Sequence, residues 1–256
     1  MTALLSHLRE RIGAGRKLLV PYLMGGVPDL VGWARAVRAI APLADVIEVG
    51  LPYSDPLMDG PVIAAAGQRA LNASIGPIDV LNAEIDSDMT PRVVMTYYNP
   101  IHRVGEEVFC AVARGSGYTG LIVPDLPLEE SQSLRDAAAA NELAWIALVA
   151  PTTSLERAAR IAKSATGFLY AVSSLGVTGE RTSLSERAAG VVEICREVSD
   201  LPVVVGIGIT TPEQARAVVE FADGVVIGSA VVRLLAEQGD GAAVRFIEEL
   251  REALDS

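Results

Sequence analysis

The sequence predicts a (β/α)8 barrel formed by one domain over residues 1–256, and three observations favour this fold. Eight short apolar runs recur, each followed by a loop rich in Gly, Pro, Ser or Asp and then by a segment with helical periodicity. Half of the residues are hydrophobic but only 5% are aromatic, as suits buried parallel strands of Val, Ile, Leu and Ala. No linker is long enough to separate two domains, and an open doubly wound sheet would leave the number of units unexplained.

The elements follow from these runs in chain order. We expect strands at 18–23, 46–50, 93–98, 120–125, 144–151, 168–174, 202–208 and 224–229. Amphipathic spacing predicts helices at 29–40, 128–140, 155–163, 184–198 and 212–221, with extra helices at 4–12, 62–71 and 242–254. Pro212 after Thr211 is a typical helix start, because proline suits the first helical position and threonine can cap it. The polar stretch 84–92 predicts that any helix before the third strand is brief.

The charge of the chain limits its partners. A formal net charge of −11 repels phosphates of nucleic acid and anionic membranes, so we expect neither as a partner. Cys110 and Cys195 show no paired spacing, which fits buried packing residues in a reducing compartment. With no secretion signal and no long apolar segment, we expect a cytoplasmic protein.

Glu48 is the most unusual residue, because an ionised carboxylate is costly inside the apolar run "VIEVG". Catalytic groups of such barrels lie at the C-terminal ends of the strands and in the loops that follow. If Glu48 points into the barrel mouth, partial desolvation raises its pKa toward the range useful for proton transfer. The alternative is that Glu48 faces a covering helix and pairs with an arginine.

The loop after this strand carries a second candidate. Pro52, Pro56 and Pro61 stiffen the loop and would hold Asp55 and Asp59 in defined positions. These aspartates are also ordinary turn residues, so the turn interpretation stays open. Asp125, in "VPDLP", is expected to act in capping or loop structure.

The last two strands predict a phosphate site. They end at Gly208 and at Gly228 with Ser229, and a helix follows each of them. Backbone N–H groups at such helix starts bind phosphate without lysine or arginine, although the glycines are also compatible with simple turns. The Gly-containing stretch 173–183 is expected to be a lid or a plain surface loop, and Tyr170 points either into the mouth or into the core.

Missing residue types narrow the chemistry. Neither Lys17 nor Lys163 lies at a strand end, as a Schiff-base aldolase requires. His7 and His102 are not spaced as metal ligands, so we expect no metal site. The type of chemistry that remains is proton transfer by carboxylates, acting on a phosphorylated substrate.

Six segments resemble the tryptophan synthase α subunit family: "IEVGLPYSDPLMDGP", "MTYYNP", "GLIVPDLPLEES", "SSLGVTGER", "VGIGITTPEQ" and "GSAVV". They occur in the same order through nearly the whole chain. The resemblance implies a barrel that cleaves indole-3-glycerol phosphate to indole and glyceraldehyde 3-phosphate, a retro-aldol reaction that needs no cofactor in this chain.

The resemblance also implies residue roles. Glu48 would protonate C3 of the indole ring, Asp59 would accept from the indole N–H, and Tyr170 would line the site. The remaining implied positions are Gly179, Gly208, Gly228 and Ser229 for phosphate, Thr178 for loop closure, and Tyr22, Met95, Ile122 and Ile207 for the indole pocket.

The family further implies a partner, a β subunit that uses pyridoxal phosphate and receives indole through a tunnel in an α2β2 complex. Asp55, Pro56 and the loop around Asn99 would face it. Two alternatives stay open: a stand-alone lyase that releases indole, and a non-catalytic barrel that activates the β enzyme.

Overall fold

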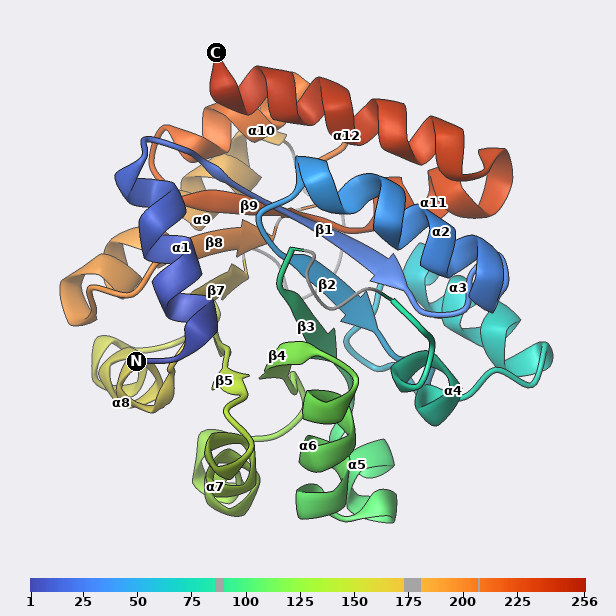
Figure 1. The fold of residues 1–256 in the computed structure, drawn as a ribbon. Helices are drawn as coiled ribbons and strands as arrows, with labels where there is room; N and C mark the ends of the chain where they lie inside the picture. Colours follow the sequence, from blue (N-terminus) through green and yellow to red (C-terminus); the bar gives the residue numbers. More distant parts are fainter. Residues whose placement is uncertain (86–89, 173–180, 207) are drawn as a thin grey trace.

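A computed structural model shows parallel strands surrounded by helices (Figure 1). It describes residues 1–85, 90–172, 181–206 and 208–256, with only the backbone of 181–185. The strands are β1 Leu18–Met24, β2 Ile47–Gly50, β3 Arg92–Met95, β4 Tyr118–Ile122, β5 Ala144–Trp145, β6 Ala147–Val149, β7 Leu169–Val172, β8 Val203–Gly206 and β9 Gly224–Ile227. All pairings are parallel.

The order of the strands confirms the predicted barrel. The sheet runs β5-β4-β3-β2-β1-β9-β8-β7-β6, and only Ile146 separates β5 from β6 in the chain. The strand predicted at 144–151 is therefore divided: its first part pairs with β4 and its second part with β7. This divided strand joins the two ends of the sheet, which gives eight strand positions.

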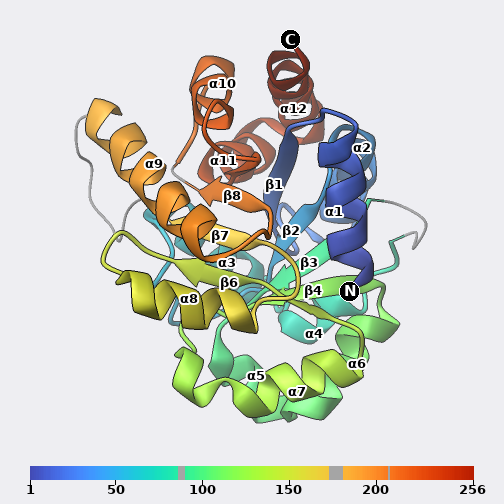
Figure 2. The ribbon, with the colours of Figure 1, turned by 90° about the vertical axis from the view of Figure 1, so that its left-hand side faces the viewer.

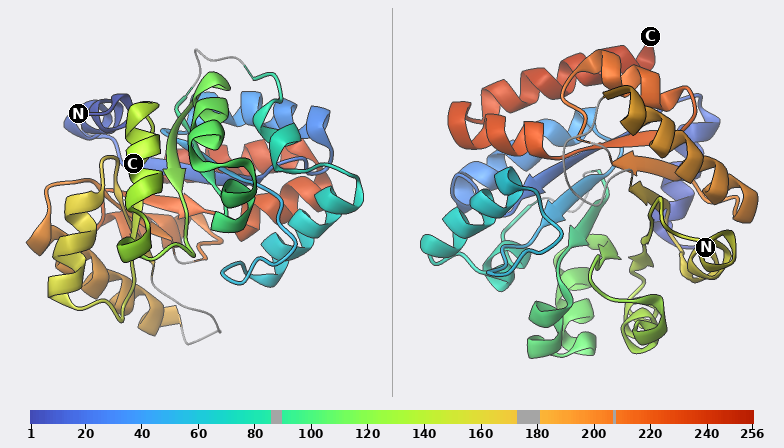
Figure 3. Two further views of the ribbon diagram at one scale, coloured as in Figure 1. Left: turned by 90° about the horizontal axis from the view of Figure 1, so that it is seen from below. Right: turned by 180° about the vertical axis from the view of Figure 1, so that it is seen from behind.

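The helices form the outer layer and include every predicted one (Figures 2 and 3). They are α1 Ala3–Gly13, α2 Leu30–Ile40, α3 Pro61–Asn72, α4 Pro77–Leu81, α5 Tyr98–Val104, α6 Glu106–Gly115, α7 Gln132–Ala140, α8 Leu155–Ser164, α9 Arg181–Val198, α10 Pro212–Val219, α11 Ser229–Gln238 and α12 Asp240–Asp255, with short 3-10 helices η1 Ala41–Leu43 and η2 Leu128–Glu130. The side chain of Thr211 caps α10, whose first residue is Pro212. The only helix between α3 and β3 in the described residues is α4, which has 5 residues, as the polar stretch predicted.

A buried carboxylate organises the N-terminal end of β2. Asp45 is 0% exposed and accepts from Arg11 at 2.9 Å, from Arg16 at 2.7 Å and from Arg251 at 3.0 Å. It also accepts from the backbone N–H of Leu19 at 2.9 Å. Arg11 lies on α1, Arg16 lies between α1 and β1, Leu19 lies on β1, and Arg251 lies on α12. Asp45 therefore holds both ends of the chain against the barrel. The candidate site lies at the other end of β2.

The face of each strand that points inward follows from two close contacts. A Cβ added to Gly120 would lie 2.7 Å from Cδ1 of Ile146 and 3.0 Å from Cγ1 of Val93, so these side chains share one face of the sheet. This face points inward, because Glu48 on the same face acts electrostatically on Tyr170 of β7, which is not a sheet neighbour of β2. Val93 is the register partner of Glu48, which in turn pairs with Tyr22. Register partners in parallel strands share a face, so Glu48 points into the barrel.

Candidate active site

Glu48 is buried deeper than the sequence indicated. Its side chain is 0% exposed, and neither carboxylate oxygen has a hydrogen-bond partner among the described residues. Burial raises the pKa of Glu48 to about 8, and the nearby charge of Asp59 contributes. The pairing with an arginine considered from the sequence is absent from the described part of the chain. At neutral pH Glu48 therefore holds a proton that it can donate.

Asp59 lies in the loop between β2 and α3, half-buried at the wall of the main cavity. Burial raises the pKa of Asp59 to about 6, and a hydrogen bond with Tyr97 opposes the rise. Its backbone N–H donates to Pro56 at 3.1 Å, so the predicted turn also forms. Asp59 can therefore be a turn residue and still present its carboxylate to the cavity. With a pKa of about 6, Asp59 is mostly ionised near pH 7.

Tyr97, which follows β3, holds the loop between β2 and α3 in place. Its hydroxyl accepts from the N–H of Met58 at 2.9 Å, and its ring stacks on Tyr53 with centroids 5.1 Å apart. The Tyr53 hydroxyl accepts from the Asn99 side chain at 3.1 Å. Tyr97 was not among the residues predicted from the sequence, because it lies inside the apolar run 93–98 and its partner Met58 is 39 residues earlier in the chain.

Two tyrosines flank the carboxyl pair. Tyr170, on β7, lines the cavity, and its ring fills the space beside Gly206, where an added Cβ would lie 2.6 Å from Cε1. Tyr22 lies over Gly50 and is 3% exposed. Burial, with the negative charges of Glu48 and Asp59, raises the pKa of both phenols well above the usual value. Both hydroxyls therefore stay protonated.

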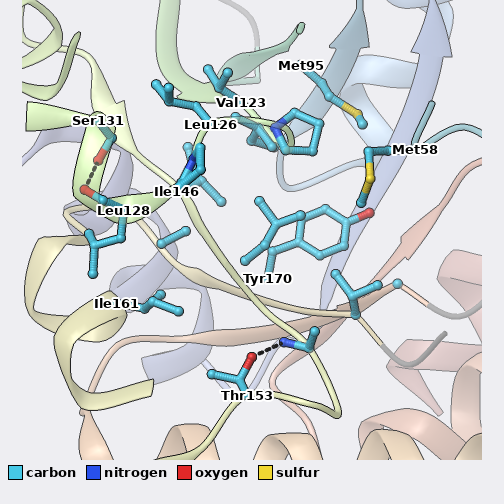
Figure 4. Close-up of a pocket in the computed structure, with 18 of the residues that line it drawn as sticks. Met58, Met95, Val123, Leu126, Leu128, Ser131, Ile146, Thr153, Ile161 and Tyr170 are labelled. Atoms are coloured by element: carbon cyan, nitrogen blue, oxygen red, sulfur yellow. Dashed lines mark hydrogen bonds between the residues drawn. The ribbon is translucent and has the colours of Figure 1, made fainter. Parts of the chain in front are cut away.

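A cavity of about 1020 Å³ opens at the C-terminal ends of the strands. Figure 4 shows Tyr170, Met58 and Met95 on one side of it. Met95 and Ile122, both expected in the indole pocket, line this cavity. Tyr22 does not line the cavity and lies beside Glu48 instead, whereas Ile207 falls outside the described residues.

The predicted phosphate residues follow two paired strands. β8 and β9 are register neighbours, so the segments that begin with Gly208 and Gly228 leave the barrel side by side. Gly208 has a positive φ of 68° and lines the cavity. Ser229 is the first residue of α11 and Gly228 is its N-cap, so the first N–H groups of α11 have no acceptor within the helix. Gly179 and Thr178 lie outside the described residues.

Other residues that were singled out from the sequence have structural roles. Asp125 accepts from the N–H of Tyr98, the first residue of α5, at 2.9 Å, which confirms the expected capping role. Cys110 and Cys195 are buried and unpaired with each other, as predicted for packing residues. Within the described residues, no three His, Cys, Asp or Glu side chains gather as metal ligands would. No helix in the same ranges has the length and apolar character needed to cross a bilayer.

Fold and site together define a TIM-barrel enzyme of the acid/base type. Two carboxyl groups whose pKa values are raised to different extents lie at the C-terminal ends of the strands, beside a helix start suited to phosphate.

Comparisons with known proteins identify the family. Residues 8–254 match the family model described as tryptophan synthase alpha chain. The tryptophan synthase alpha chain of a Synechocystis strain is 46% identical and covers 99% of this chain and 98% of its own. That of a Picosynechococcus strain is 44% identical and covers 99% of this chain and all of its own. The chain therefore belongs to the tryptophan synthase alpha chain family.

Solved structures agree with this assignment. A structure of Mycobacterium tuberculosis tryptophan synthase has a TM-score of 0.91 and 37% identity, covering 99% of this chain and 98% of that one. The tryptophan synthase subunit alpha of Legionella pneumophila has a TM-score of 0.90 and 34% identity, covering 100% of this chain and 99% of that one. The fold prediction is thus confirmed, and the enzyme is a lyase of tryptophan biosynthesis.

Proposed function

We propose that this chain cleaves indole-3-glycerol phosphate to indole and glyceraldehyde 3-phosphate, with Glu48 and Asp59 as the working groups. The observation that carries the proposal is the placement of two carboxyl groups at the barrel mouth, with Glu48 fully buried without a hydrogen-bond partner in the described residues and Asp59 at the cavity wall. Burial raises the pKa of Glu48 to about 8, so that it is mostly protonated at pH 7, and that of Asp59 to about 6, so that it is mostly ionised. Environments that separate two carboxyl pKa values in this way assign one group as acid and the other as base or anion.

The steps balance without an additional reactant. Glu48 donates its proton to C3 of the indole ring, and the positive charge that develops on the ring nitrogen is stabilised by Asp59, which accepts the N–H. The bond between C3 and the first glycerol carbon then breaks, and its electrons return to the ring. The hydroxyl proton on that carbon passes to the Glu48 carboxylate as the aldehyde forms.

The remaining groups bind and orient the substrate. We assign the phosphate to the N–H groups at the start of α11, with Gly208, Gly228 and Ser229, because the helix start carries partial positive charge. Gly179 and Thr178 stay predictions for the same end of the substrate. Met95, Ile122 and Tyr170 provide the apolar and aromatic surface for the indole ring.

The partner is a β subunit of the same synthase, in an α2β2 complex. The loop between β2 and α3 supports this proposal because Leu57 is 80% exposed and Met58 is 47% exposed, and both border the cavity. Exposed apolar side chains at the rim of a site are typical of a docking surface. The pyridoxal phosphate expected for the complex then belongs to the β subunit, and this chain needs no cofactor of its own. The cytoplasmic location stays a prediction.

The test is a direct assay of indole release from indole-3-glycerol phosphate by the purified chain, with and without β subunit. We expect slow release alone and strong activation by the β subunit. Full activity without the partner would favour the stand-alone lyase. No release under either condition would leave only the activating barrel and would refute the proposal.

A further inference from the structure

The main cavity reaches both faces of one strand. Side chains alternate along a strand, so Ile146 and Leu148 point into the barrel while Trp145 and Ala147 point toward the helices. All four residues line the same cavity. A single cavity can touch both faces only if it passes around an edge of the strand.

The pairing pattern locates that edge. β4 pairs with β5 only at Gly120↔Ala144 and Leu121↔Trp145, and the N–H of Ile146 donates to Leu121 at 3.1 Å. Beyond Ile146 the strand continues as β6 and pairs with β7 alone. The barrel wall therefore opens between the end of β4 and β6, where Ile122 and Leu148 both line the cavity.

The opening leads to a space outside the barrel wall, between α7 and α8. We call this space the outer chamber, and it is lined by Leu128, Ser131, Trp145, Ala147, Ile161 and Ser164. In Figure 4, Ile146 lies between the group of Leu128, Ser131 and Ile161 and the group of Tyr170, Met58 and Met95. The cavity as a whole, about 1020 Å³, is at the upper end of the ~300–1,000 Å³ typical of ligand pockets.

The lining defines the chemistry of an occupant. The walls are apolar or aromatic, with hydroxyl groups at two places. The Ser164 hydroxyl donates to the Ile161 carbonyl at 2.7 Å and keeps a lone pair that can accept one N–H. The Ser131 hydroxyl donates to the Leu128 carbonyl at 2.8 Å and accepts from Arg135 at 3.1 Å.

The charged groups at the rim already bind one another. Arg157, which also lines the cavity, donates to both carboxylate oxygens of Glu129 at 2.8 and 3.0 Å. Arg160 donates to the same carboxylate at 3.2 Å. These bonds connect η2 with α8 and leave an uncharged interior, so the chamber suits a neutral, flat aromatic molecule with a single N–H donor.

We propose that the outer chamber is a second binding site for indole, beside the catalytic mouth and reached from it through the gap between β4 and β6. This inference rests on the proposed function, since indole is the neutral aromatic product of that cleavage. An indole molecule that moves into the chamber leaves the catalytic mouth free for the next substrate while staying inside the protein.

Binding of a fluorinated indole to the full-length chain, followed by fluorine NMR, tests the proposal. We expect two bound molecules per chain, one of which shows magnetisation transfer to the ring protons of Trp145. Ser164→Phe and Leu128→Trp should fill the chamber and reduce the stoichiometry to one. The matched controls Ser164→Ala and Leu128→Met keep its space and should retain two.

A stoichiometry of one in the wild-type chain, or no transfer to Trp145, would overturn the proposal, as would two bound molecules in folded chamber-filling variants. The transfer to Trp145 needs no substitution, so the test survives if both variants unfold. Indole release by the wild-type chain is measured separately. Release with one bound indole refutes only the chamber, whereas two bound indoles without release refute only the cleavage.

Discussion

Tyr22 on β1 and Glu48 on β2 are register partners, so their side chains enter the barrel at the same level. The phenol covers Gly50, two residues beyond Glu48, and has little exposed surface. The tyrosine thereby helps to exclude water from the carboxyl group. Exclusion of water keeps Glu48 protonated, as proton donation requires.

Glu48→Gln should abolish most of the cleavage, because an amide has no proton of suitable acidity to give to a ring carbon. We expect kcat to fall by at least ~10²–10⁴-fold, the contribution typical of general acid/base catalysis. Substrate affinity, measured by calorimetry, should change little. Near-normal turnover in the indole assay would show that another group supplies the proton.

Asp59→Asn should also reduce kcat, by ~10²-fold or more, because the ring nitrogen loses the negative charge that stabilises it. Asp55→Asn is the matched control, since Asp55 lies in the same loop but is exposed and does not line the cavity. In assays of the isolated chain, the control should resemble wild type. Equal losses in both variants would instead indicate a general disturbance of the loop.

The pH profile should be bell-shaped. Activity requires protonated Glu48, with a pKa of about 8, and ionised Asp59, with a pKa of about 6. The rate should therefore fall as pH rises through about 8 and as it drops through about 6. Measurement of kcat/KM across this interval checks both limbs. In Asp59→Asn the acid limb should disappear, and its persistence would assign that limb to a different group.

Glu48 should also make stability depend on pH. Its pKa rises from 4.5 to about 8 on folding, so the folded state holds the proton more tightly. The stability contributed by this proton is complete below the unfolded value. It is lost between the unfolded and the folded value, at roughly 1.4 kcal/mol per pH unit, and the loss is complete once the pH has risen through the folded value. Glu48→Gln should remove this loss.

Thermal unfolding of wild type and Glu48→Gln at several pH values measures the effect. The Tm advantage of the variant should grow between pH 5 and pH 8. Parallel Tm curves for the two proteins would show that Glu48 has no raised pKa in the folded chain.

Gly206→Ala should displace Tyr170, because the added Cβ would lie 2.6 Å from the ring. Overpacking of this kind costs about 1–3 kcal/mol, and we expect a lower Tm together with reduced turnover. Gly190→Ala in α9 is the control, since an added Cβ there meets nothing within 4 Å. Combining Gly206→Ala with Tyr170→Leu should restore stability, and failure to restore it would place the clash elsewhere.

Local patterns in the sequence were sufficient to predict the architecture. Each strand is a short apolar run, and the repeated alternation with helices admits few topologies, so the barrel and its catalytic end could be predicted. Thr211 could also be assigned, because it caps the helix that begins at the next residue. A capping role was expected for Asp125 too, but its partner, the N–H of Tyr98, lies 27 residues away at the start of a helix that the sequence did not predict.

Tertiary contacts determined the features that could not be predicted from the sequence. Tyr97 positions the loop of Asp59 from β3 and α5, far along the chain, and no local pattern indicates such a contact. The division of one predicted strand at Ile146 depends on where β4 ends and β7 begins to pair. The gap that opens the outer chamber therefore has no signature in the run 144–151 itself.

The sequence by itself determined that a glutamate lies within an apolar strand, followed by a proline-stiffened loop with an aspartate. Only the tertiary structure decided that Glu48 is fully buried, without a hydrogen-bond partner in the described chain, and close enough for the charge of Asp59 to raise its pKa. The physical reason is that a pKa depends on water exclusion and on neighbouring charges. Here the tyrosines on β1 and β7 and the anchored loop set both conditions, because the barrel brings these distant segments together.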